Sequence, residues 1–139
     1  MAGPDRALPS RHNAGAGRWL SVDETPEGEG AAMMAVPYLA AFELTRALAP
    51  AMVARGNGQM VYMTSVSAFL HVPGSSGYSA ARWAVRALAG LVRADLRGTG
   101  IGVTLLAPAE VDSPHFDHNP GEALDEDGSR CVKGGRTAS

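Results

Sequence analysis

Residues 58–108 read GQMVYMTSVSAFLHVPGSSGYSAARWAVRALAGLVRADLRGTGIGVTLLAP, and their pattern predicts the fold class. It opens with a β-prone run, QMVYMTS, and closes with another, IGVTLLAP, which Pro108 ends. Both runs are almost continuously apolar, as expected for strands covered on both faces. An Ala-rich helix pattern lies between them, so the order is strand, helix, strand. That order predicts a parallel pair with a right-handed crossover, and therefore an α/β fold.

The helix pattern that begins near Tyr78 has three faces when residues are placed at about 100° intervals. The apolar face, which we expect to cover the sheet, holds Ala81, Val85, Leu88, Ala89, Val92 and Leu96. A basic stripe beside it, bordered by Tyr78, holds Arg82, Arg86, Arg93 and Arg97. A third arc of mostly small side chains holds Ala80, Ala84, Ala87, Leu91 and Ala94. Small residues let a second helix approach closely, from this chain or from another subunit, so a homo-oligomer through helix faces is predicted.

The bulk composition fits one small globular domain. The chain has 139 residues, of which 45% are hydrophobic and 19% charged, and its formal net charge is −2. This balance gives no indication of nucleic acid or a membrane surface as a partner. The single cysteine, Cys131, excludes an intrachain disulfide and favours a reducing cytoplasm. No apolar run reaches the roughly 18 residues of a membrane span, and the histidines lack metal-ligand spacing, so no metal site is predicted.

Order is predicted for the middle of the chain. Residues 1–30 and 117–139 are rich in Gly, Pro and charge without periodicity, so we expect irregular segments at both ends. The α/β domain is expected over residues 31–116. Patterned sequence starts and stops abruptly within the chain, with unpatterned sequence outside it, which suggests a truncated or frame-altered reading of a longer gene.

Prolines affect two parts of the predicted fold, the helix over residues 31–55 and the segment before Asn13. Residues 31–55 read as helix, with Pro37 and Pro50 as kinks or restart points. No strand is predicted before Asn13, because residues 6–12 (RALPSRH) hold proline and charge. A core of two strands would leave a sheet edge and apolar helix faces exposed, so we expect self-association or poor solubility.

Three polar side chains are predicted to gather beyond the carboxyl end of the first strand, where open parallel sheets bind ligands. Ser65 follows that strand, Tyr78 begins the helix, and Arg82 lies one turn further along the same face. A fixed positive charge favours the ionised form of a phenol. Tyr78 is then suited to exchange a proton with a substrate oxygen that Ser65 hydrogen-bonds. This is the chemistry of alcohol–ketone interconversion, which needs a hydride carrier.

At these residues the chain resembles the short-chain dehydrogenase/reductase family, whose active site has a serine after the fifth strand and a Tyr-x-x-x-Lys motif on the next helix. Ser65 and Tyr78 stand at the family's usual spacing. Residues 36–68 (VPYLAAFELTRALAPAMVARGNGQMVYMTSVSA) are similar to the family's helix and strand before the serine. Residues 100–114 (GIGVTLLAPAEVDSP) are similar to the strand and loop that contact the nicotinamide, and HNAG at 12–15 resembles the Asn-Asn-Ala-Gly element.

The resemblance implies a fold, a cofactor and a set of site residues. The fold would be a partial Rossmann-like, doubly wound parallel sheet with flanking helices and without the N-terminal βαβ units. The cofactor would be NAD or NADP, and the substrate a small-molecule alcohol or carbonyl. Catalysis would fall to Ser65, Tyr78 and Arg82. The cofactor-binding positions implied are Asn13, Ala14, Gly15, Tyr78, Arg82, Pro108, Ala109, Val111 and Ser113.

The chain departs from the family pattern at several points. Arg82 replaces the lysine, and its planar fork differs from an ammonium in shape and reach. Pro37 stands where the family has a catalytic asparagine, and it has no side-chain amide. Ala109 replaces the glycine of the family's Pro-Gly pair, and Ser113 replaces the threonine. The Gly-rich Thr-Gly-x-x-x-Gly-x-Gly turn that holds the dinucleotide pyrophosphate has no counterpart in the sequence.

Two hypotheses follow from this pattern. In the first, the chain or the longer protein it represents is an oxidoreductase that transfers hydride between NAD(P) and an alcohol or carbonyl. Tyr78 would then be the general acid/base, Ser65 the oxyanion partner, and Arg82 the charge beside Tyr78. In the second, the chain is a catalytically silent remnant that acts, if at all, through helix-mediated association.

Overall fold

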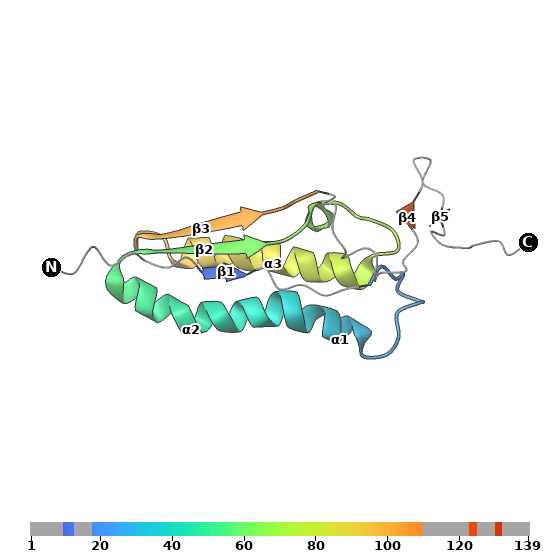
Figure 1. Ribbon diagram of the computed structural model, residues 1–139, viewed down its shortest axis with the longest axis horizontal. Helices are drawn as coiled ribbons and strands as arrows, with labels where there is room; N and C mark the ends of the chain where they lie inside the picture. The colour runs from blue at the N-terminus through green and yellow to red at the C-terminus, as the bar shows by residue number, and fades with distance from the viewer. Residues whose placement is uncertain (1–9, 13–17, 110–122, 125–129, 132–139) are drawn as a thin grey trace, which may run out of the picture.

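The three main strands form a parallel sheet in the order β1-β2-β3, with the helices on one side of it (Figure 1). The computed structural model describes residues 10–12, 18–109, 123–124 and 130–131. The strands are β1 (Ser10–His12), β2 (Gly58–Met63) and β3 (Ile101–Leu106). β2 pairs with β3 over its full length, from Gly58 opposite Ile101 to Met63 opposite Leu106. Helix α3 (Ser76–Asp95) connects these two strands, which confirms the predicted parallel βαβ unit.

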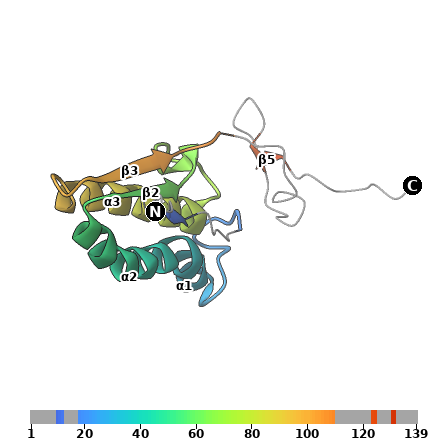
Figure 2. The same cartoon turned by 60° about the vertical axis from the view of Figure 1, so that its left-hand side comes forward.

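The predicted helix before β2 is longer than the sequence pattern indicates. It consists of α1 (Glu29–Met34), the π-helical segment η1 (Ala35–Leu39) and α2 (Ala40–Arg55), which together form one rod beside α3 (Figure 2). Pro37 lies in η1 and Pro50 inside α2. A proline lacks the N–H of the α-helical ladder and its ring crowds the preceding turn. The wider π turn accommodates Pro37 at the point where the sequence predicts a kink.

The prediction that no strand precedes Asn13 is wrong. Ser10, Arg11 and His12 form β1 and pair in parallel with Met60, Val61 and Tyr62 of β2. Strand formation depends on pairing with a neighbour more than on local residue preference, so three polar residues can extend an existing sheet. Within 117–139, for which the sequence predicts an irregular tail, β4 (Ala123–Leu124) and β5 (Arg130–Cys131) pair in an antiparallel arrangement.

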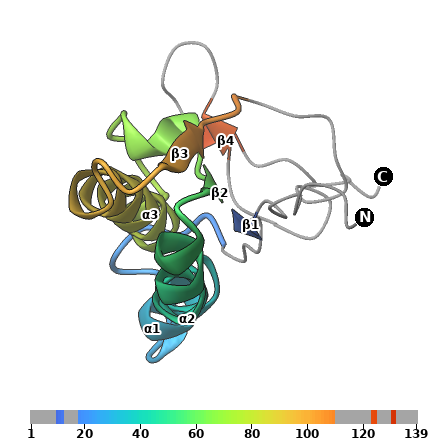
Figure 3. The same ribbon diagram turned by 90° about the vertical axis from the view of Figure 1, so that its left-hand side faces the viewer.

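The helices cover one face of the sheet, as the end-on view shows (Figure 3). Along β2 the alternate residues Gly58, Met60 and Tyr62 are buried, whereas the residues between them are half-buried. On the opposite face, the Gln59 side chain donates to Thr104 Oγ1 across the strand pair, at 2.9 Å. None of the helices among the described residues is long and apolar enough to cross a bilayer.

The predicted sheet-covering face of α3 is the centre of the core. Ala81, Val85, Leu88, Ala89 and Val92 are all buried there. Val85, Leu88, Ala89 and Val92 pack with Met60 and Tyr62 of β2 and with residues of α2 in one hydrophobic cluster. The third arc of α3 faces away, and Leu91 keeps 64% of its surface exposed.

Tyr62 is a fully buried tyrosine whose hydroxyl lies 2.6 Å from Thr45 Oγ1 of α2. Burial raises the pKa of the Tyr62 phenol above its usual value of 10.0, although the hydrogen bond with Thr45 opposes the shift. The folded protein therefore holds the phenol proton more tightly than the unfolded chain does. The contribution of the buried Tyr62 phenol to the free energy of unfolding is complete below pH 10. This contribution is lost as the pH rises from about 10 through the raised pKa.

We expect Tyr62→Phe to flatten this alkaline decline. The parent protein should lose unfolding free energy steeply above pH 10, whereas Tyr62→Phe should lose less over the same range, since it has no buried phenol to ionise. Urea unfolding at pH 8, 10 and 11 measures the difference. Tyr38→Phe, a change in the half-buried tyrosine of η1, serves as the control. Parallel declines of the parent and Tyr62→Phe would contradict the assignment.

Candidate active site

Ser65 lies just beyond the carboxyl end of β2, where the sequence places it. Its backbone is extended (φ −151°, ψ 161°), and it caps the short 3-10 helix η2 (Val66–Ala68). The Ser65 hydroxyl oxygen accepts a hydrogen bond from the Ser67 N–H at 3.3 Å. Since the oxygen serves there as an acceptor, its O–H remains available to donate to a ligand oxygen.

Thr64, one residue earlier, joins β2 to the two elements beside it. The Thr64 N–H donates to the Leu106 carbonyl at 2.8 Å, at the end of β3. Its side-chain hydroxyl donates to the backbone carbonyl of Arg82 in α3, also at 2.8 Å. Thr64 is buried, with 3% of its surface exposed. These two bonds fix α3 at Arg82 relative to the strand end that carries Ser65.

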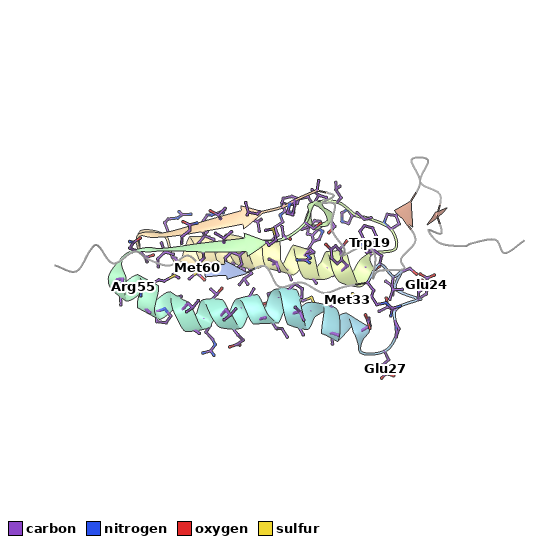
Figure 4. The ribbon with its side chains drawn as sticks, in the orientation of Figure 1. Trp19, Glu24, Glu27, Met33, Arg55 and Met60 are labelled. Carbon is purple, nitrogen blue, oxygen red and sulfur yellow. The ribbon has the colours of Figure 1, made fainter. Side chains whose placement is uncertain are left out.

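Tyr78 lies in the first turns of α3 and is 8% exposed. Its ring stacks against the indole of Trp19, with ring centroids 5.9 Å apart and an interplanar angle of 25°. Trp19 comes from the segment before α1 and lies beside the N-terminal end of α3 (Figure 4). The guanidinium carbon of Arg82 lies 5.0 Å from the centre of the Tyr78 ring. Tyr78 therefore contacts both an aromatic ring and a cation.

Arg82 is buried, with 7% of its surface exposed. It therefore differs from Arg93 and Arg97 of the predicted basic stripe, which are exposed. Arg86 is half-buried, and the exposed Arg93 donates to the Val103 carbonyl of β3, at 2.9 Å from Nη2. The Nε atom of Arg82 has no hydrogen-bond partner among the described residues. A buried N–H without a partner is costly, so this atom marks a position where a ligand oxygen would be favoured.

Two further contacts position the start of α3. The Ser76 N–H donates to the Leu20 carbonyl at 3.2 Å, which satisfies one of the free donors of the first turn. Gly77 packs against Met33 of α1, and a Cβ added at Gly77 would lie 2.6 Å from the methionine sulfur. Figure 4 shows Met33 beside α3. A side chain at Gly77 would displace the flexible end of Met33, so glycine immediately before Tyr78 lets Met33 pack closely against α3.

The loop after β3 lies next to η2. The Pro108 carbonyl accepts a hydrogen bond from the Val66 N–H at 3.2 Å, so Pro108 is adjacent to the turn that Ser65 caps. Ala109 is exposed. The other predicted cofactor contacts, Asn13, Ala14, Gly15, Val111 and Ser113, lie outside the described residues.

The structure thus brings Tyr78 and Arg82 into direct contact and places Ser65 and Pro108 at one sheet end. No direct hydrogen bond joins Ser65 to Tyr78 among the described residues. Pro37, at the position of the family's asparagine, is buried in η1 and offers no polar side chain. Trp19 and Thr64 were missed by sequence reasoning, because a lone tryptophan in a loop and a threonine at a strand end carry no motif.

A surface groove of about 460 Å³ lies on a different side of α3 from Tyr78 and Arg82. Its lining residues are Leu70, His71, Val72, Pro73, Ser76, Ser79, Ala80 and Trp83. No group of three or more His, Cys, Asp or Glu side chains within the described part of the chain could hold a metal ion.

Comparison with known proteins identifies the lineage. The sequence model of the short chain dehydrogenase family matches residues 11–122. The chain belongs to the short-chain dehydrogenase family. A gluconate 5-dehydrogenase from Burkholderia cenocepacia J2315, solved in complex with NADP and tartrate, superposes with a TM-score of 0.74 and is 31% identical, covering 78% of this chain and 43% of that one. Its likeness confirms a Rossmann-like α/β fold for this member of the short-chain dehydrogenases.

Relatives in sequence agree with this assignment. The uncharacterized oxidoreductase YbbO of Escherichia coli K12 is 29% identical over 107 residues, which are 77% of this chain and 40% of that protein. The 1-deoxy-11-beta-hydroxypentalenate dehydrogenase of Streptomyces exfoliatus is 42% identical over 72 residues, 51% of this chain and 26% of that protein. This short-chain dehydrogenase chain therefore spans less than half the length of the relatives it matches.

Proposed function

We propose that the chain carries the serine–tyrosine active site of an oxidoreductase that transfers hydride between NAD or NADP and a small alcohol or carbonyl compound. The observation that carries the proposal is the contact of Tyr78 with the buried Arg82, at the sheet end where Ser65 caps η2. Family membership supports it, since relatives are named dehydrogenases and oxidoreductases. A cytoplasmic location, suggested by the single cysteine, is part of the same proposal.

The roles of the three side chains follow from their chemistry. Tyr78 supplies or removes the proton at the substrate oxygen, because a phenol can act as acid and, once ionised, as base. The Ser65 O–H donates a hydrogen bond to the same oxygen and stabilises negative charge that develops on it. Arg82 keeps a permanent positive charge against the Tyr78 ring.

The residues of the site fit a dinucleotide in one respect. The buried Nε of Arg82 lacks a partner among the described residues and suits a hydroxyl oxygen of a ribose. When bound, NAD or NADP would supply the hydride acceptor or donor that these side chains lack. Pro108 and Ala109 would border it, together with the positions outside the described residues that the family resemblance implies.

Turnover with a panel of substrates tests the proposal. NADH or NADPH should be consumed when the chain is mixed with aldehydes, ketones or sugar-derived carbonyl compounds, as followed by nicotinamide absorbance. Ser65→Ala should lower the rate by about 10²- to 10³-fold, as expected for loss of one oxyanion donor. Ser76→Ala, a change in an exposed serine at the start of α3, should leave it unchanged. Equal rates for Ser65→Ala and the parent would contradict the role of Ser65.

A second candidate function is helix-mediated self-association without catalysis. Pro37 in place of an amide and the exposed third arc of α3, centred on Leu91, favour it. Under this alternative the occupant of the arc is a second copy of the chain. Light scattering should then give a dimer mass that Leu91→Glu reduces to that of a monomer, because a buried unpaired charge opposes association. A monomeric parent chain would exclude this candidate.

A further inference from the structure

Two neighbouring side chains of α3 hold the turn that follows Ser65. The indole N–H of Trp83 donates to the Ser67 carbonyl at 2.9 Å. One turn further along the helix, the Arg86 guanidinium donates to the Ala68 carbonyl, also at 2.9 Å. The two acceptors are consecutive carbonyls of η2, so α3 contacts this turn through a pair of side-chain hydrogen bonds.

Contacts with aromatic rings hold the side chains of Trp83 and Arg86 in place. The guanidinium carbon of Arg86 lies 4.1 Å from the centre of the Phe69 ring and 5.2 Å from that of Trp83. The Trp83 ring also stacks on His71, with centroids 5.6 Å apart. Cation–π and stacking contacts of this kind restrict the rotamers of both donors. The donors are therefore held in place on the segment they bind.

The turn transmits this restraint to Ser65. The N–H of Ser67 donates to the Ser65 side-chain oxygen, and the N–H of Ala68 donates to the Ser65 carbonyl at 3.0 Å. Ser67 and Ala68 are both buried. Ser67 and Ala68 thus each accept a hydrogen bond from a side chain of α3 through the carbonyl and donate one to Ser65 through the N–H. The rotamer and backbone of Ser65 depend on where these two residues are held.

We propose that Trp83 and Arg86 are positioning residues, which together fix Ser65 relative to Tyr78. The inference rests on the proposed function, in which Ser65 and Tyr78 act on one substrate oxygen. Tyr78 and both donors belong to the same helix, so the pair of hydrogen bonds ties the two reacting side chains to one rigid element. Trp83 and Arg86 touch neither the substrate oxygen nor the cofactor in this account. Their effect is on the geometry of Ser65.

Amide hydrogen exchange tests the restraint without requiring turnover. Trp83→Phe keeps an aromatic ring but removes the N–H that binds Ser67. The amides of Ser67, Ala68 and Phe69 should exchange about 2- to 10-fold faster, as expected for loss of one hydrogen bond. The amides of Val85 and Leu88, in the core, should keep their rates. Unchanged rates at Ser67 and Ala68 would overturn the proposal.

Arg86→Gln provides an independent variant, and Arg97→Gln is its matched control, because Arg97 is an exposed arginine just beyond the end of α3. Arg86→Gln should accelerate exchange at Ala68 and Phe69, whereas Arg97→Gln should not. If Trp83→Phe accelerates hydrogen exchange equally at every amide of α3, the variant has lost global stability. The exchange rates of Arg86→Gln then decide whether the positioning role holds. Equal exchange in Arg86→Gln and Arg97→Gln would then overturn the proposal.

Kinetics separates this inference from the proposed function. With a substrate that the parent chain turns over, Trp83→Phe should lower kcat about 10-fold and leave KM and the Kd for the dinucleotide unchanged, because positioning affects the transition state. An unchanged kcat, with turnover still abolished by Tyr78→Phe, would overturn the positioning role and leave the proposed function intact. Absence of turnover in the parent would overturn the proposed function, and exchange at Ser67 would still decide whether the pair orders Ser65.

Discussion

Tyr78→Phe is expected to lower kcat by about 10²- to 10⁴-fold, the range that a positioned general acid or base contributes. The change removes one oxygen atom and keeps the ring. The stack with Trp19 and the contact with Arg82 both involve that ring, so the fold and the arrangement of the site should persist. The dinucleotide Kd should change by about fivefold at most, because a single neutral hydrogen bond is worth about 1 kcal/mol.

Steady-state rates and dinucleotide titration measure these two effects separately. Tyr38→Phe is a suitable control, since Tyr38 lies in η1 and its ring contacts Phe42, with centroids 6.2 Å apart. It should keep the parent kcat. A Tyr78→Phe variant as active as Tyr38→Phe would show that the phenol takes no part in proton transfer.

Gly100→Ala should reduce the free energy of unfolding by about 2–4 kcal/mol. Gly100 precedes β3 with φ +81°, a conformation that residues with a Cβ rarely adopt. An added Cβ would also overlap the backbone carbonyl oxygen of Gly56, which ends α2. Both glycines flank the β2–β3 pair, so neither backbone can move without disturbing the register of the sheet.

Gly98→Ala is a matched control for this prediction. Gly98 has φ +80°, and a Cβ there would meet no atom within 4 Å. Gly98→Ala therefore has the free-energy cost of a positive φ, about 1 kcal/mol, without an overlap between the added Cβ and another atom. Urea unfolding of the two variants isolates the effect of the Gly56 contact. Equal losses in the two variants would show that the turn yields to accommodate the methyl group.

The βαβ unit and the faces of α3 could be predicted because they depend on local periodicity. The apolar residues from Ala81 to Val92 repeat at helical spacing, and all five predicted between these bounds are buried. The adjacency of Tyr78 and Arg82 follows from the same geometry, since residues four apart share a helix face. The spacing of Ser65 and Tyr78, together with the similar segments on both sides of them, predicted the family, which the family comparison confirms.

Features that depend on distant contacts could not be predicted. β1 forms from polar residues because β2 offers a strand to pair with, and no local sequence pattern indicates a strand there. Trp19 reaches Tyr78 from a segment without periodicity. The sequence pattern places Arg82 in the basic stripe with three other arginines, and its burial depends on how α3 packs in the folded chain.

Titration of the purified chain with NADH and NADPH, followed by calorimetry, tests directly whether the site holds a dinucleotide. Binding of the cofactor is independent of which alcohol or carbonyl is the substrate, so it tests the site itself. The proposed function predicts saturable binding of at least one dinucleotide, which Arg82→Met should weaken because the buried Nε and the charge are lost. Heats indistinguishable from dilution with both dinucleotides would contradict the proposed function and favour the non-catalytic alternative.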